Sequence, residues 1–174
     1  NFKDKAMKLK EFVLGLIFAV LMTGCSLAPN HEWSVSPETI NTEIAGVEIK
    51  VSPVCSTIWG CESFSIKLNN TTDQDVVVDW NKTLYIRNGQ TSGTFMYEGV
   101  IYSKRSEQKS PDVVFPEGEM TKVIYPVNLV IYRNNFGWDH EEMPAGENGI
   151  YFNIKVGEEE YKKKATLEIS VQKK

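Results

Sequence analysis

Histidine is scarce in this chain: only His31 and His140 among 174 residues carry an imidazole. A zinc site needs three or four ligands at fixed spacing. The acidic stretch at residues 139–142 would point its side chains to alternate sides of an extended chain. We therefore expect a solvated loop there, with no metal and no cofactor. A GxSxG elbow, a P-loop, a dinucleotide fingerprint and HExxH are also missing, so no familiar motif indicates an enzyme.

Basic residues are outnumbered, with 19 Lys and Arg against 23 Asp and Glu and a formal net charge of −4. The one short basic cluster, residues 162–164, comes almost directly after the acidic residues 158–160, and the two blocks offset each other. Nucleic-acid binding needs a basic patch. We therefore expect no nucleic acid among the partners.

The chain also lacks an apolar run long enough to span a bilayer. Residues 12–22 are apolar, and as a helix they would cover roughly 17 Å of a hydrocarbon core of about 30 Å. Lys8 and Lys10 precede this run and small residues follow it, which is the pattern of a secretory signal peptide. Residues 1–24 are therefore interpreted as upstream residues plus a signal peptide that is removed.

The apolar run ends in the letters LMTGC, residues 21–25. This motif resembles the lipobox of bacterial lipoproteins, in which the cysteine is acylated and the signal is cut just before it. The resemblance implies that Cys25 carries the lipid, including a palmitate-type chain, and anchors the protein to a membrane. Ser26 is not the Asp of an inner-membrane retention signal. The resemblance thus favours the outer membrane, facing the periplasm or the cell surface, with the outer face of the cytoplasmic membrane as the alternative.

Cysteine is rare as well, with three residues in the chain. Once the lipobox accounts for Cys25, Cys55 and Cys61 remain, close together in the letters CSTIWGC. Export would place them in an oxidising compartment, so a disulfide is the expected state. Closing a loop of about seven residues stabilises a fold by roughly 2.4 kcal/mol on the chain-entropy model.

Helical periodicity is missing beyond residue 40. Apolar residues instead alternate with polar ones in short segments separated by polar turns, which predicts half-buried strands. The clearest segments are residues 47–51, 64–68, 76–80, 152–156 and 165–171. Eight or nine such strands predict an all-β, antiparallel, immunoglobulin-like β-sandwich, with a small β-barrel as the alternative. Residues 25–40 are interpreted as the lipidated cysteine plus a flexible tether, and residues 41–174 as a single sandwich domain.

Two stretches of the expected sandwich carry a second resemblance. The letters VDWNKTLYI at residues 78–86 and ENGIYF at residues 147–152 resemble small envelope lipoproteins of uncharacterised function with an immunoglobulin-like domain. The resemblance implies a place in the cell envelope and no activity.

The candidate binding residues are aromatic. Residues 134–149 lack strand periodicity, and a loop of that length in a compact domain tends to be functional or disordered. This loop carries Phe136, Trp138 and His140, and Trp59 lies between the two cysteines. We expect these four residues to form a binding surface. The alternative is that Trp138 folds back and caps the sandwich.

These observations predict a lipid-anchored envelope lipoprotein that acts as a non-catalytic binding module for another envelope component. One alternative is a periplasmic hydrolase with an unrecognised carboxylate site. The other is a mobile-element exclusion or inhibitor lipoprotein. An enzyme should have a cleft that collects two or more acids, whereas a binding module should expose Phe136 or Trp138.

Overall fold

The computed structural model describes residues 31–56, 59–134 and 136–173, which form fourteen β-strands and two short 3₁₀ helices. The predicted signal peptide, Cys25 and tether residues 26–30 lie outside them. The elements in chain order are β1 (His31–Ser36), β2 (Ile40–Ile44), β3 (Val47–Ser56), β4 (Gly60–Asn70), β5 (Val76–Val78), β6 (Leu84–Arg87), β7 (Gln90–Thr91), β8 (Phe95–Tyr97), η1 (Tyr102–Lys104), β9 (Asp112–Val114), β10 (Glu119–Pro126), η2 (Val127–Leu129), β11 (Val130–Arg133), β12 (Gly137–His140), β13 (Gly146–Val156) and β14 (Glu159–Lys173). Within the same residues, no helix has the length and hydrophobicity that a membrane span requires.

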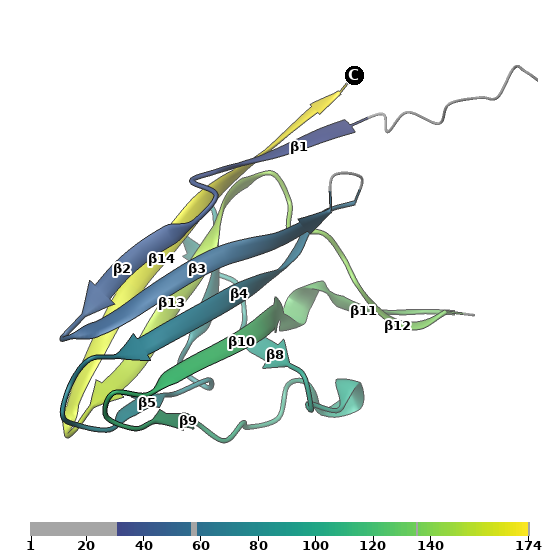
Figure 1. The fold of residues 1–174 in the computed structure, drawn as a ribbon. Helices are drawn as coiled ribbons and strands as arrows, with labels where there is room; N and C mark the ends of the chain where they lie inside the picture. The colour runs from purple at the N-terminus through teal and green to yellow at the C-terminus, as the bar shows by residue number, and fades with distance from the viewer. Residues whose placement is uncertain (1–30, 57–58, 135, 174) are drawn as a thin grey trace, which may run out of the picture. The chain divides into compact units, whose positions relative to one another are not determined.

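The strands form two main antiparallel sheets and a separate hairpin. One sheet has the order β1-β14-β13-β5-β9, with β6 beside β13 and β7 beside β6, and the other has the order β2-β3-β4-β10-β8 (Figure 1). Neither sheet closes into a barrel, so the predicted all-β antiparallel sandwich is confirmed. The described residues contain more than eight or nine strands, partly because β1 lies in the predicted tether and because β7 and β12 have only two and four residues.

The core lies between the two sheets and uses the alternating residues that the sequence indicates. One face of each strand is apolar and buried, as expected for a sandwich. The buried members of the predicted segments are Val47, Ile49, Val51, Phe64, Ile66, Leu68, Val76, Val78, Trp80, Phe152, Ile154, Val156, Ala165, Leu167 and Ile169. These residues belong to one continuous cluster, which makes the sandwich a rigid support for its loops.

The domain begins earlier than predicted. Residues His31–Ser36 form β1, which pairs with β14 from His31↔Lys173 to Ser36↔Glu168. Trp33 and Val35 pack against the core from this strand. The predicted flexible tether is therefore wrong for residues 31–40. Trp33 and Val35 are only two alternating apolar residues, which is a weak sequence signal for a strand. The strand β1 forms because the edge of β14 is available for pairing.

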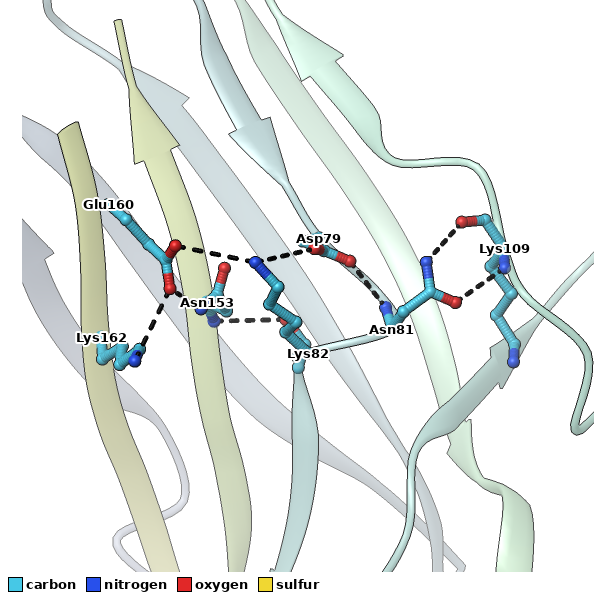
Figure 2. A network of polar contacts seen from close by, with 8 residues as sticks. Asp79, Asn81, Lys82, Lys109, Asn153, Glu160 and Lys162 are labelled. Atoms are coloured by element: carbon cyan, nitrogen blue, oxygen red, sulfur yellow. Dashed lines mark hydrogen bonds and ion pairs between the residues drawn. The ribbon is translucent and has the colours of Figure 1, made fainter. Parts of the chain in front are cut away.

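A polar network holds the turn after β5 against the connection between β8 and β9 (Figure 2). The Asn81 side chain donates to the carbonyl of Lys109 at 2.8 Å and accepts from the Lys109 N–H at 2.8 Å. Asp79 accepts from the Asn81 N–H at 2.9 Å, and Lys82 lies 3.8 Å from Asp79 and 3.6 Å from Glu160. The connection that carries η1 is thus fixed to the sandwich at Lys109.

A second polar cluster closes the sandwich edge where β9 and β10 meet. The Trp80 indole N–H donates to Asp112 at 2.7 Å, and Lys122 pairs with the same carboxylate. The Lys122 ammonium also lies 3.8 Å from the ring centroid of Tyr97. Because these groups satisfy one another, a lysine can stand on the core side of β10 without an unpaired charge.

Candidate functional site

Half of the predicted irregular loop at residues 134–149 is strand. It contains β12 and the first residues of β13, and β12 pairs with β11 in the register Tyr132↔Trp138 and Val130↔His140. The Phe136 N–H donates to the Arg133 carbonyl at 3.1 Å near the turn. The strand β12 has only four residues, which is too few for an alternating pattern to reveal it in the sequence. Figure 1 shows the β11–β12 hairpin projecting beyond the end of β10.

Five rings connect this hairpin to the rest of the domain, and we call them the aromatic row: Tyr125, His140, Tyr102, Trp138 and Tyr132. Tyr125 stacks on His140 with centroids 4.2 Å apart, and His140 lies 5.7 Å from Tyr102. Tyr102 in turn stacks on Trp138 at 5.7 Å, and Trp138 meets the edge of Tyr132 at 5.3 Å. Aromatic pairs at such distances contribute about 0.5–1.5 kcal/mol each beyond their buried area.

The residues around η1 hold the other side of the aromatic row. The Arg105 guanidinium carbon lies 4.7 Å from the Trp138 ring centroid, and its Nη1 donates to the Tyr102 carbonyl at 3.0 Å. The Lys109 ammonium donates to the carbonyls of Arg105 and Glu107 at 2.8 and 3.1 Å. Burial lowers the pKa of Lys109. The β8–β9 connection is therefore tied internally and presents Tyr102 and Arg105 to the hairpin in a defined position.

The exposed end of the hairpin is aromatic. Phe136 is 85% exposed, Tyr132 is 61% exposed and Trp138 is 37% exposed. A salt bridge of 2.7 Å joins Arg133 to Asp139 across the two strands. Protein–protein hot spots are enriched in aromatic and arginine side chains, and this surface has that composition. The paired strands of the hairpin are already ordered, so binding would cost little conformational entropy.

His140 lies in the aromatic row between two tyrosine rings. Its Nε2 is buried and has no hydrogen-bond partner in the part of the chain that the structure describes. Burial lowers the pKa of His140 below its ordinary value, while the charges of Glu62 and Asp139 act in the opposite direction. Burial therefore favours the neutral imidazole, which packs between the rings of Tyr125 and Tyr102 at the hairpin base.

The predicted disulfide is confirmed, and it lies at a second hairpin. Cys55 and Cys61 are bonded and face each other across β3 and β4. The Met143 N–H donates to the Cys61 carbonyl at 2.7 Å, so the β12–β13 connection is tied to this hairpin. Trp59 follows the described part of β3 in a turn, with 69% of its surface exposed.

The four predicted binding residues lie on two different hairpins. Trp138 and His140 come together through Tyr102, and Phe136 lies beyond them near the hairpin turn. Trp59 belongs to the β3–β4 hairpin instead. Sequence reasoning missed Tyr102, Tyr125, Tyr132 and Arg105. Tyr125 and Tyr132 end the apolar stretches TKVIY and NLVIY, but nothing local in the sequence indicates that their rings meet the hairpin.

A shallow hollow of about 640 Å³ on the outer face of the five-stranded sheet collects carboxylates. Glu43 and Glu48 oppose each other across β2 and β3, and Glu119 completes the acidic side. Glu48 accepts from Asn69 at 3.0 Å, and Glu119 pairs with Lys67 at 2.7 Å. All three carboxylates are exposed to solvent, so the hollow does not resemble an enclosed catalytic cleft. Among the described residues, no three His, Cys, Asp or Glu side chains are grouped closely enough to hold a metal ion.

Comparison with known proteins finds solved structures with weak similarity to this chain. No family model and no curated protein matches the chain. The X-ray structure of Northeast Structural Genomics Consortium target SoR45 is 13% identical, with a TM-score of 0.31, over 84% of this chain and 88% of that one. Chicken MD-1 complexed with lipid IVa is 10% identical, with a TM-score of 0.25, over 82% of this chain and 99% of that one. At these scores neither similarity supports a conclusion about function.

Proposed function

We propose that this chain is a lipid-anchored envelope lipoprotein whose β-sandwich binds another envelope protein through the β11–β12 hairpin. The anchor is Cys25, in the lipobox-like letters LMTGC. The location is the outer membrane, facing the periplasm or the cell surface. The domain acts by binding and without catalysis.

One observation carries the proposal: Phe136 is almost fully exposed near the turn of a hairpin that the aromatic row holds in place. A solvent-exposed phenylalanine gains nothing for the fold, whereas it gains about 1.5–3 kcal/mol when a partner buries it. Because the hairpin base is already packed, binding loses little conformational entropy there. Tyr132 and the free part of Trp138 extend the same surface.

A photo-crosslinking amino acid at position 136 tests the binding surface in intact cells. We expect one discrete adduct with an envelope protein. The matched control is position 115, because Phe115 is also an exposed phenylalanine at 68% but lies in the β9–β10 turn. An identical adduct pattern at both positions, or none at position 136, would refute the hairpin as the binding surface.

The anchor is tested separately. Cys25→Ser should abolish incorporation of a palmitate analogue and leave the signal peptide uncut, because the lipid-accepting thiol is gone. The control is Ser26→Ala, a substitution next to the lipidation position that keeps the thiol, and this variant should label normally. Another cysteine is a poor control, because replacing Cys61 would also remove the disulfide. Labelling of the Cys25→Ser variant would show that Cys25 is not the anchor.

A further inference from the structure

Trp59 has no part in the β11–β12 surface, and its exposure needs another explanation. Its backbone N–H is 3.3 Å from the Ser56 hydroxyl, within the turn of the β3–β4 hairpin. Val54, on the same hairpin, is 45% exposed. Burying two apolar side chains of this size would be favourable, and nothing else in the described residues covers the Trp59 ring enough to bury it.

The start of the domain lies beside this hairpin. A Cβ atom added to Gly60 would lie 2.9 Å from the Trp33 ring. The Trp33 side chain of β1 therefore packs directly on the backbone of Gly60, the residue after Trp59. Gly60 also has a φ of +78°, in the left-handed region. The positive φ and the close approach of the Trp33 ring both require a glycine at this position. His31, the first described residue, is two positions before Trp33, or about 7 Å along a strand.

The proposed anchor therefore restricts where Trp59 can go. Six peptide units separate Cys25 from His31, and covalent geometry limits their reach to about 20 Å. A lipid on Cys25 would keep the β1 end of the domain within that distance of the bilayer surface. Trp59 lies at this end, because the Trp33 ring of β1 packs on Gly60 directly after it.

We infer that Trp59 inserts into the lipid headgroup region and orients the domain on the membrane that carries it; this inference rests on the proposed lipid anchor. Tryptophan is favoured at the membrane–water interface because its ring is apolar and its indole N–H stays hydrated. The chain is acidic overall, with net charge −4, so attraction to anionic lipids does not drive this contact. The contact should therefore be insensitive to salt.

The test uses the mature lipidated protein in vesicles of phosphatidylethanolamine and phosphatidylglycerol, with or without brominated acyl chains as a short-range quencher. We expect brominated vesicles to quench wild-type tryptophan emission and Trp59→Phe to lose at least half of that quenching. Trp138→Phe is the matched control and should keep it. Added salt at 0.5 M or so should change neither result, because screening acts on exposed charges.

Equal quenching of the wild type and the Trp59→Phe variant would overturn the inference. The inference would also be overturned if Trp59 emission changed with the protein-to-lipid ratio but not with bromination of the lipid. In that case a second copy of the chain, and not the bilayer, would cover the ring. Palmitate labelling of the same preparations separates the two proposals. Labelled protein without Trp59 quenching refutes only the membrane contact, whereas unlabelled protein refutes the anchor and the contact together.

Discussion

Replacing Trp138 and Phe136 by alanine, one at a time, should have opposite effects on stability and on binding. Trp138 is nearly two-thirds buried, against Tyr102, Tyr132 and Arg105. Truncating a fully buried tryptophan costs about 3–5 kcal/mol, so this fraction corresponds to about 2–3 kcal/mol. That value includes the cation–π contact, which contributes about 0.5–1 kcal/mol. Phe136→Ala should change the unfolding free energy by less than about 0.5 kcal/mol, because so little of the ring is buried.

Urea unfolding of both variants measures the change in the free energy of global unfolding, provided that the denaturant dependence (the m-value) matches that of the wild type. The hairpin projects from the sandwich and could detach locally, so hydrogen exchange of the β11 and β12 amides is needed as well. Trp138→Ala should speed that exchange even if the rest of the domain stays protected. Phe136→Ala should leave it unchanged and lose the adduct formed by a crosslinker at the neighbouring exposed residue Tyr132.

Two results would refute this reasoning. Equal destabilisation by both substitutions would mean that Phe136 packs in solution and is not available to a partner. A Trp138→Ala variant with wild-type stability and wild-type exchange would mean that the aromatic row does not hold the hairpin. The binding surface would then lack the preorganisation that the proposal requires.

Replacing both Cys55 and Cys61 by alanine should lower stability by about 2 kcal/mol in urea unfolding and leave the circular dichroism spectrum sandwich-like, since the loop they close is short; an unfolded product would contradict this. Asn81→Ala should cost about 1–3 kcal/mol, because it removes two part-buried hydrogen bonds to the Lys109 backbone, whereas Lys82→Ala, which removes only surface ion pairs, should cost about 0.5 kcal/mol or less; similar losses would refute the distinction. Because burial lowers the pKa of His140 in the fold, the unfolded chain takes up the proton first, so the part of the stability that depends on His140 should be constant above about pH 7 and decline as the pH falls through 6.5 toward the folded pKa. In thermal melts, His140→Phe should remove this decline of stability below about pH 7. A variant with the same pH profile as the wild type would contradict the role assigned to His140.

Much of the fold is predictable from local sequence because strand periodicity is a local property. The alternating residues of β3, β4, β13 and β14 are buried as expected. Gly157 and Glu158 form the turn between the last two strands. The disulfide follows from two cysteines six positions apart. The strand β1 could not be predicted in this way, because its pairing with β14 joins the two ends of the domain.

The sequence by itself determined the all-β class, the core faces of the long strands, the disulfide and the aromatic character of the candidate site. Only the tertiary structure decided what each aromatic side chain does. Trp138 and His140 pack because Tyr102 and Tyr125, which lie far away in the chain, come to meet them. Phe136 is 85% exposed beside the hairpin turn and is not a member of that row. Whether a loop aromatic packs or protrudes depends on contacts between distant segments, and these contacts leave no period in the sequence.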